Sequence, residues 1–314
     1  MNNAIITGGA GFIGSHLADS IINEYDRIYL IDNLVRTQST RNINHLLNDQ
    51  KFVFIQDDIS SGRNYFDTTF DKIEISTMYH LAATRISRCS VYPSEGHKYL
   101  ADGGFNVVKF CAERGIKLFF SSTASVYNNP RKLPILESDP YEPHTLYGSA
   151  KYYTENLIRT FAKSNGLKHS ICRFFSVYGD RMDCEGVYTE IIFNWLNNIK
   201  SGLREVTVYG NPDEKILDLV YVTDVISAIN MVTSYSNNDV YNVSTEYGVT
   251  ITQLIKVIEE VTGVSLSVNI LPENRIDIES KRIGSTEKLR QIGWKPMNSL
   301  YDGIEKTYKW INSL

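Results

Sequence analysis

The stretch "ITGGAGFIG", from Ile6 to Gly14, joins a short apolar run to a segment with helical periodicity. Gly8, Gly11 and Gly14 follow the spacing G-x-x-G-x-x-G. Glycine tolerates positive φ and lets the backbone approach a pyrophosphate, which the N-terminus of the next helix can bind. Glycine-rich turns also occur for structural reasons alone, so the stretch predicts a dinucleotide site only together with its surroundings.

The sequence around this turn alternates between β-branched apolar runs and helical periodicity over roughly the first 175 residues. The expected strands are "NAIITG", "RIYLID", "KFVFIQ", "STMYHLAA", "KLFFSST" and "KHSICRF", and the expected helices span 12–24, 40–48, 99–113 and 147–164. Such alternation is typical of a parallel sheet covered by helices on both faces. We therefore predict an α/β fold with a Rossmann-type doubly wound parallel sheet.

After Arg173 the rhythm changes, which predicts a smaller C-terminal α/β substrate domain. A helix over 190–201 and strands at "EVTVYG" and "LSVNIL" are expected there. The predicted dinucleotide-binding domain spans 1–176, and 217–244 is expected to return to it. The predicted substrate domain consists of 177–216 and 245–314.

Acidic and small residues follow three of the expected strands. Asp32 ends the second strand, 18 residues beyond Gly14, where a carboxylate accepts hydrogen bonds from an adenosine ribose and repels a 2′-phosphate. This favours NAD over NADP, although Asp32 taken alone also suits a turn before Asn33. Asp58 and Ile59 follow the third strand, and Leu81, Ala82 and Ala83 end the fourth, where ligands meet a parallel sheet. Simple packing is the alternative for the small residues.

The segment "LYGSAKYYTENL" places Tyr147 four residues before Lys151 at the start of an expected helix, so both side chains share one face. An ammonium close to a phenol stabilises the phenolate, and such a tyrosine can take a proton from an alcohol as hydride leaves the same carbon. Y-x-x-x-K also occurs often by chance. Its position after the glycine turn, Asp32 and a strand ending in "SSTASVY" favours a catalytic pair.

These motifs together resemble the extended short-chain dehydrogenases/reductases, and within them the NAD-dependent nucleotide-sugar epimerases and dehydratases, closest to UDP-glucose 4-epimerase-like members. The matching stretches are "TGGAGFIG", "HLAA", "SSTASVY", "YGSAK", "RFFSVYG", "LVYVTDV", "YNVS" and "IGWKP", in the expected order over almost the whole chain. The resemblance implies a Rossmann domain that binds NAD, a second domain that binds a nucleoside diphosphate sugar, and chemistry at their junction.

The resemblance also implies roles for particular residues. Thr123 would hydrogen-bond the sugar oxygen that becomes a carbonyl, Tyr147 would remove the proton from that hydroxyl, and Lys151 would bind the nicotinamide ribose and tune Tyr147. The implied cofactor-binding residues are Gly8, Gly11, Phe12, Ile13, Gly14, Asp32, Asn33, Asp58, Ile59, Leu81, Ala82, Ala83, Tyr147 and Lys151. The expected substrate-binding residues are Arg85, Ser121, Ser122, Thr123, Phe175, Ser176 and Arg275. Support of the loop is the alternative for Ser121 and Ser122, and an exposed loop position is the alternative for Arg85.

The residues after Thr123 favour one reaction within the family. Related 4,6-dehydratases carry an Asp-Glu pair there, because eliminating water requires an additional acid and base, but this chain has Ala124 and Ser125. The expected reaction is therefore C4 epimerisation through a transient 4-keto sugar, with the hydride returned by bound NAD. Net oxidation or reduction, or dehydration at C4, is the alternative, and a nucleotide-binding module without catalysis is a third hypothesis.

Several positions depart from the family pattern and leave the sugar and the base open. Ser176 stands where an Asn commonly contacts the diphosphate, and Leu100 stands where a contacting Asn often lies. Leu217 precedes Asp218 where an Arg often binds the diphosphate, with Lys215 close by. Lysine is a point charge and cannot reproduce a bidentate arginine contact.

The composition restricts the partners and the compartment. The chain has 314 residues, 42% of them hydrophobic, and a formal net charge of −4, without a dense basic run, so we expect no nucleic-acid partner. No apolar run approaches 18 residues and "MNNAIITGG" lacks a leader pattern, so we expect no membrane segment and a cytoplasmic location. The six histidines lack ligand spacing and the four cysteines form no C-x-x-C pair, so we expect no metal site and reduced thiols.

A homodimer is also expected. The helices over 99–113 and 147–164 carry Phe105, Phe110, Leu157 and Phe161, and members of the resembled family often pair through these two helices. Packing of the same side chains onto the sheet is the alternative.

Overall fold

The protein folds into two compact units in the computed structural model, which describes residues 2–35, 40–62, 64–127, 130, 132–183, 191–235, 237–273 and 281–314. The first unit consists of Met1–Asn128, Pro140–Arg173 and Ile226–Tyr241. The second consists of Asn129–Asp139, Phe174–Val225 and Asn242–Leu314.

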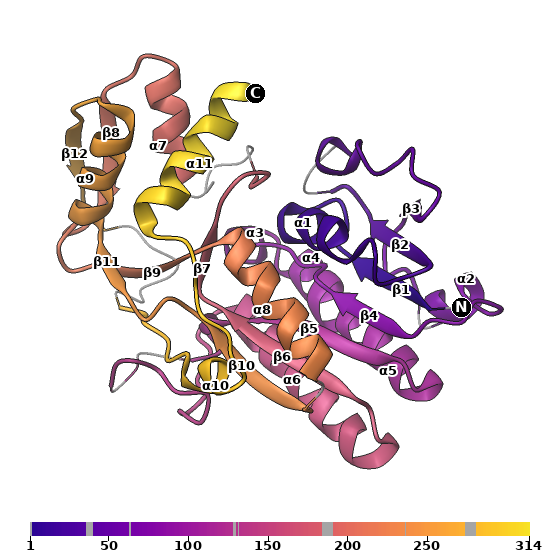
Figure 1. Cartoon of the computed structure of the whole chain (residues 1–314). Helices are drawn as coiled ribbons and strands as arrows, with labels where there is room; N and C mark the ends of the chain where they lie inside the picture. Colours follow the sequence, from indigo (N-terminus) through magenta and orange to yellow (C-terminus); the bar gives the residue numbers. More distant parts are fainter. Residues whose placement is uncertain are drawn as a thin grey trace. The chain divides into compact units, whose positions relative to one another are not determined.

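A seven-stranded sheet with the order β10-β6-β5-β4-β1-β2-β3 forms the centre of the first unit (Figure 1). Its strands are β1 (Asn3–Thr7), β2 (Arg27–Asp32), β3 (Phe52–Gln56), β4 (Thr77–His80), β5 (Lys117–Thr123), β6 (His169–Phe174) and β10 (Asp239–Val243). All pairings among β1 to β5 are parallel. The predicted Rossmann-type α/β fold is confirmed, with the order of strands reversing between β1 and β4 as in doubly wound sheets.

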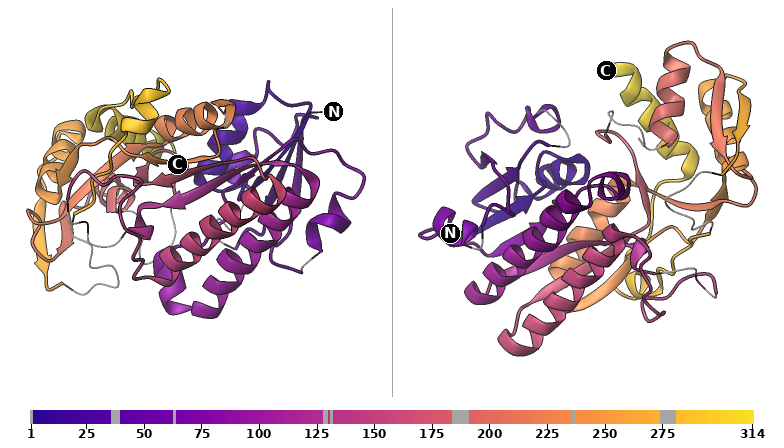
Figure 2. Two further views of the ribbon diagram at one scale, coloured as in Figure 1. Left: turned by 90° about the horizontal axis from the view of Figure 1, so that it is seen from below. Right: turned by 180° about the vertical axis from the view of Figure 1, so that it is seen from behind.

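Helices cover both faces of this sheet, as the two views of Figure 2 show: α5 and α6 lie side by side on one face, and α1 and α8 lie on the other. The helices of the first unit are α1 (Phe12–Ile21), α2 (Tyr65–Thr69), α3 (Ile86–Val91), α4 (Pro93–His97), α5 (Gly103–Arg114), α6 (Leu146–Asn165) and most of α8 (Val222–Tyr235). Short turns are η1 (Arg41–Ile43), η2 (Lys98–Asp102) and η3 (Ala124–Val126). Because both faces are covered, the strands are almost continuously apolar.

The core between the sheet and α5 and α6 is dense and partly aromatic. Phe66 and Phe110 stack with ring centroids 5.1 Å apart, and Phe120 of β5 is buried in the same cluster. Gly104 lets α5 approach α6, since a Cβ at this position would lie 2.6 Å from Oγ1 of Thr154. The close contact fixes α6, the helix that carries Tyr147 and Lys151, against the sheet.

Two predicted helices differ from the structure. Over 40–48 there is only the 3₁₀ turn η1 followed by turns, where Thr40 Oγ1 donates to Asn44 Oδ1 at 2.7 Å. Polar side chains of this kind compete with helical backbone bonds, which the apolar spacing alone did not reveal. The predicted helix 99–113 divides into the π turn η2 and the α-helix α5.

In its described residues, the second unit contains two smaller sheets and four complete helices, beside the first residues of α8. One sheet has the order β11-β9-β7, and the other pairs β12 with β8. The elements are β7 (Ser176–Tyr178), α7 (Ile191–Lys200), β8 (Glu205–Tyr209), β9 (Ile216–Tyr221), β11 (Gly248–Thr250), α9 (Ile251–Thr262), β12 (Ser267–Leu271), α10 (Glu287–Gln291) and α11 (Leu300–Ser313). Within the predicted returning segment 217–244, residues 226–241 belong to the first unit and 217–225 to the second.

A buried ion pair joins α6 to β6 inside the first unit. Glu155 and Arg173 are both fully buried, and the guanidinium donates to both carboxylate oxygens, at 2.9 and 2.6 Å. Ser122 of β5 and Arg159 of α6 also donate to this carboxylate, at 2.6 and 2.7 Å. Although burial opposes ionisation, the hydrogen bonds and charge of Arg173 and the bond from Ser122 hold the pKa of Glu155 below its usual range.

The Arg173 guanidinium has a second set of partners. It donates from Nη1 to the Tyr127 hydroxyl at 2.6 Å and lies over the rings of Tyr127 and Tyr141, 4.9 and 4.5 Å from their centroids. This planar cation therefore links β6 to the residue that follows η3.

Among the described helices, none is both long and apolar enough to cross a bilayer.

Replacing Glu155 by Gln should lower the free energy of unfolding by about 3–5 kcal/mol, because it leaves the buried Arg173 without its counter-charge. The measurement is urea denaturation of both proteins. Glu95→Gln is the matched control, since it removes a similar arginine partner, Arg88, at the surface, where both side chains are about two-fifths exposed. The control should cost at most about 1 kcal/mol. If both variants lost the same free energy of unfolding, the buried ion pair of Glu155 would contribute no more to stability than the exposed pair of Glu95.

Candidate functional site

The glycine turn forms a backbone cradle at the end of β1. Gly8 has φ of 73°, and its N–H donates to the Ile31 carbonyl at 2.8 Å. A Cβ on Gly8 would lie 2.8 Å from the backbone nitrogen of Ala82, and a Cβ on Gly14 would collide with the Gly8 carbonyl oxygen. The turn thus brings bare backbone and the N-terminus of α1 together, which fits a bound pyrophosphate.

Asp32 lies beside this turn at the end of β2. Its carboxylate accepts from the backbone N–H of Ala10 at 3.1 Å and of Leu34 at 2.9 Å. These bonds hold the carboxylate at the carboxyl end of the sheet, where a ribose of a dinucleotide bound in the turn would be met. The adjoining Asn33 accepts from the Val35 N–H at 3.2 Å, as a turn residue does.

The residues expected around the rest of the cofactor lie in the same unit. Phe12 and Ile13 begin α1 and are partly exposed. Asp58 follows β3 and accepts from Lys98 Nζ at 3.0 Å; burial opposes ionisation, but the bonds from Ser60 and Lys98 lower the pKa of Asp58. Ile59 is buried against Gly103.

The end of β4 is tied to β1. The backbone N–H of Leu81 donates to the Thr7 carbonyl at 3.1 Å, and that of Ala82 donates to the Thr7 hydroxyl at 3.3 Å. Ala83 packs near Tyr147 in a small apolar cluster with Cys89. Small residues at this end of β4 therefore lie between the glycine turn and the start of α6.

Thr123 and Tyr147 lie beside the contact between the turn η3 and the N-terminus of α6. The Thr123 hydroxyl accepts from the Ser125 N–H at 3.1 Å and so caps the turn η3. The first turn of α6 is capped in the same way by Thr145, which accepts from Gly148. A Cβ on Gly148 would collide with the Ser125 carbonyl oxygen, so glycine here lets the N-terminus of α6 touch η3. The residue before this glycine is Tyr147.

Lys151 is a buried cation with one hydrogen-bond acceptor in the described structure. It is 3% exposed, and its ammonium donates to the Ser121 carbonyl at 2.7 Å and lies 5.9 Å from the centroid of the Tyr147 ring. Burial lowers the pKa of Lys151 to about 7, and electrostatic interactions with Cys89 and Glu155 oppose this effect. Two ammonium N–H groups remain for a ligand, and ribose hydroxyls of a dinucleotide suit them.

The structure engages the hydroxyls of Ser121 and Ser122 within the protein. Ser121 donates to the His80 carbonyl at 3.0 Å, and Ser122 donates to Glu155. Their expected contact with substrate stays a prediction. The sequence did not single out Glu155 and Arg173, although Glu155 lies one helical turn beyond Lys151 on the same face, and Arg173 follows the apolar residues Ile171 and Cys172 in an expected strand.

The remaining predicted substrate residues are spread over both units. Arg85 precedes the first residue of α3 in the first unit and is partly exposed. Phe175 is buried in the second unit against Gly284, and Ser176 begins β7. Arg275 lies outside the described residues.

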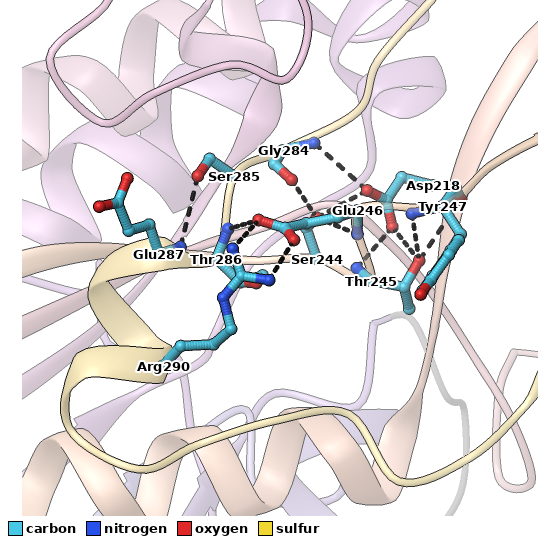
Figure 3. Close-up of polar contacts among 10 residues, drawn as sticks. All are labelled: Asp218, Ser244, Thr245, Glu246, Tyr247, Gly284, Ser285, Thr286, Glu287 and Arg290. Carbon is cyan, nitrogen blue, oxygen red and sulfur yellow. Dashed lines mark hydrogen bonds and ion pairs between the residues drawn. The ribbon is translucent and has the colours of Figure 1, made fainter.

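A second buried carboxylate organises the second unit (Figure 3). Asp218 of β9 is 1% exposed and accepts from the hydroxyls of Ser244 and Thr245, at 2.6 and 2.7 Å, and from the backbone N–H groups of Thr245 and Gly284. Burial raises the pKa of Asp218, and these bonds oppose the shift. They connect β9 to the chain after β10 and to the segment before α10.

The hydrogen-bond network around Asp218 continues to α10 through Glu246. This residue has φ of 65°, accepts from the Thr286 N–H at 2.7 Å and forms a bidentate pair with Arg290, at 2.6 and 3.0 Å. Next to this network, the backbone N–H of Arg282 donates to the Ile216 carbonyl at 3.3 Å. The contacts fix the segment of basic residues Lys281 and Arg282 alongside β9.

In the ranges that the structure describes, no group of three or more His, Cys, Asp or Glu side chains is arranged to hold a metal ion.

Comparison with known proteins gives consistent matches along the chain. Residues 5–307 match the family model described as GDP-mannose 4,6 dehydratase. A putative UDP-glucose 4-epimerase of Methanocaldococcus jannaschii is 30% identical over 98% of each chain. A UDP-glucose 4-epimerase structure from Thermotoga maritima with UDP-glucose has a TM-score of 0.90 at 29% identity and covers 99% of each chain. One from Thermus thermophilus with NAD has a TM-score of 0.88 at 26% identity and covers 98% of each chain.

The substitution Gly14→Ala should abolish measurable NAD binding, because the added methyl group would displace the Gly8 carbonyl and deform the cradle. The measurement is a calorimetric titration of the folded variant with NAD. Gly11→Ala is the control: its Cβ would lie 3.1 Å from the same oxygen, so a small shift accommodates it and most of the affinity should remain. Full affinity in Gly14→Ala would contradict the assignment of this turn.

Proposed function

The chain belongs to the extended short-chain dehydrogenase/reductase family of nucleotide-sugar epimerases and dehydratases, and within this family we propose that it is an NAD-dependent nucleotide-sugar 4-epimerase. The observation that carries the proposal is the arrangement of Thr123, Tyr147 and Lys151 around η3 and the start of α6. In that arrangement no carboxylate follows Thr123, since η3 consists of Ala124, Ser125 and Val126.

The proposed roles of the cofactor-binding residues follow from their positions. The turn of Gly8, Gly11 and Gly14 binds the pyrophosphate of NAD, and Asp32 accepts hydrogen bonds from the adenosine ribose. Lys151 donates its two remaining N–H groups to the nicotinamide ribose. NAD, when bound, supplies the hydride acceptor and then the hydride donor.

The proton chemistry belongs to side chains of the first unit. The Thr123 hydroxyl orients the sugar oxygen, and Tyr147 takes the proton from that oxygen as the C4 carbon is oxidised. The Lys151 ammonium stabilises the phenolate that Tyr147 must carry to act as a base. After the 4-keto sugar turns over, Tyr147 returns the proton to the C4 oxygen. The cycle has no net redox change because the bound cofactor would give back to C4 the hydride that it took.

Substrate, location and domain roles are parts of the same proposal. A nucleoside diphosphate sugar is the proposed substrate, with Arg85, Ser121, Ser122, Phe175, Ser176 and Arg275 as proposed contacts. The first unit, which is close to the expected 1–176 with part of 217–244, is proposed to bind NAD, and the second unit, which is close to the expected 177–216 with 245–314, is proposed to bind the sugar nucleotide. The proposed location is the cytoplasm.

The proposed homodimer uses α5 and α6. Phe110 is 2% exposed and stacked in the core, so it is unsuitable for this contact, contrary to the sequence-based expectation. Leu157 and Phe161 are partly buried against the same core, whereas Tyr153 of α6 is 44% exposed and Phe105 of α5 is partly exposed. Tyr153 and Phe105 are the side chains that we propose to meet a second copy.

The direct test is incubation with UDP-, GDP-, CDP- and dTDP-sugars, with the sugar protons followed by NMR and the NADH absorbance followed in parallel. A second C4 diastereomer without net NADH is expected. A persistent keto sugar or accumulating NADH would instead indicate a dehydratase or dehydrogenase, which the name of the matching family model keeps as the alternative.

With the substrate identified, Tyr147→Phe should lower turnover at least roughly 100-fold, because the phenol is the proton acceptor, while NAD stays bound. The checks are steady-state rates and NAD content after gel filtration. Tyr153→Phe removes a hydroxyl from the exposed face of the same helix and should keep its rate. A fully active Tyr147→Phe enzyme would exclude the proposed mechanism.

Sedimentation velocity at micromolar concentration should give a dimer of about 71 kDa, twice the chain mass of 35.7 kDa. Tyr153→Glu should shift it towards the monomer, because a charge would be buried against the second copy. Tyr235→Glu, at an aromatic residue of α8 that is 56% exposed, is the control. A wild-type monomer would exclude the pairing.

A further inference from the structure

A row of side chains crosses the sheet from the glycine turn to the catalytic lysine. Strand register pairs Thr7 of β1 with His80 of β4, and His80 with Phe120 of β5. Paired residues of parallel neighbours point to the same face of a sheet. The three side chains therefore stand next to one another on one face. Thr7 is the last residue of β1, and Gly8 of the glycine turn follows it directly.

Each neighbouring pair in this row is in contact. The Thr7 hydroxyl and His80 Nδ1 are 2.8 Å apart, and the rings of His80 and Phe120 are stacked, with centroids 5.5 Å apart and planes at 26°. The Lys151 ammonium lies over the Phe120 ring, 4.8 Å from its centroid. All four side chains are at most 3% exposed, so water competes little with these contacts.

We propose that the row Thr7, His80 and Phe120 is a positioning device for Lys151, in which the face of the Phe120 ring holds the ammonium and the His80 imidazole holds the ring. The attraction between a cation and an aromatic face is strongest where both are desolvated, as they are here. The ring contributes no hydrogen bond, so the ammonium keeps its remaining N–H groups for a ligand. This inference rests on the proposed function for its catalytic consequence, but the contact itself is independent of it.

Among the described residues, the neutral supports of the Lys151 cation are the Ser121 carbonyl, which accepts its hydrogen bond, and the Phe120 ring. The titratable groups that face this cation are Cys89 of α3, Tyr147 and Glu155 of its own helix, and His80 of β4. Burial, with a smaller effect from Lys151, lowers the pKa of His80 to about 3, so the imidazole is neutral and does not repel the ammonium at working pH. Burial of Cys89 raises the pKa of its thiol to about 11, so this group is neutral as well.

The test weakens the ring's attraction without changing its shape. Phe120 is replaced by 3,4,5-trifluorophenylalanine, which withdraws electron density from the ring face, and the Lys151 titration is followed by NMR of ¹³C-labelled lysine in the cofactor-free protein. Loss of the attraction should lower the pKa of Lys151 by roughly half a unit to one and a half units. The alkaline limb of the pH–rate profile should move to lower pH by the same amount.

The matched control is the same replacement at Phe119, the preceding residue of β5, which is fully buried and has its ring contact with Tyr79 instead of a lysine. It should leave the Lys151 titration unchanged. Thr7→Val, which removes the bond to His80, should give a smaller shift in the same direction.

An unchanged Lys151 titration in a folded Phe120 variant, or an equal shift in the Phe119 control, would overturn the proposed row. These results can be told apart from a failure of the proposed epimerase function. If the titration shifts as expected while no nucleotide sugar is epimerised, the row is supported and the activity is not.

Discussion

The buried charge of Glu155 is the constraint on which the arrangement of the first unit depends. A carboxylate without water must find donors inside the protein, and Glu155 takes them from three elements: Ser122 of β5, Arg173 of β6 and Arg159 of its own helix. Because Ser122 immediately precedes Thr123, the same interaction that keeps the core electrically balanced also fixes the strand end from which the candidate site begins. It fixes the face of α6 too, since Lys151 and Tyr147 lie one and two turns before Glu155.

The second unit also contains a buried carboxylate, which neutral donors stabilise. Asp218 has no arginine or lysine among the hydrogen-bond donors described here, but two hydroxyls and two backbone N–H groups surround it. An ion pair such as Glu155–Arg173 resists the loss of either member, whereas a carboxylate held by short side chains and backbone constrains loop geometry directly. The chain thus uses one buried acid to join regular elements and the other to join loops.

The sequence allowed the first half of the site to be predicted because its determinants are local. The glycine spacing, Asp32 and the strand ends all depend on short segments whose backbone conformation is nearly prescribed, and the structure places them together at one edge of the sheet. The interactions of Glu155 and Asp218 are different, because each depends on distant donors: Arg173 lies 18 residues from Glu155, and Gly284 lies 66 residues from Asp218. In the sequence, Glu155 looks like an ordinary helical acid. The predicted helix over 40–48 was wrong for a local reason. The prediction followed the apolar spacing there and did not consider the preference of Thr40 and Asn44 for side-chain hydrogen bonds. This chain has Leu217 where the family pattern often has an Arg, and Arg275, a candidate to replace that charge, lies outside the described residues.

The buried environment of Lys151 has a thermodynamic consequence for the whole protein. A group whose pKa lies near 7 is protonated in only part of the molecules at neutral pH. Any ligand that accepts hydrogen bonds from this ammonium selects the protonated molecules, and its binding is therefore accompanied by proton uptake from the solvent. Affinity for such a ligand must fall as pH rises above 7, although the ligand itself does not titrate there. With Lys151 donating to the nicotinamide ribose as proposed, retention of the dinucleotide depends on the proton concentration around the protein.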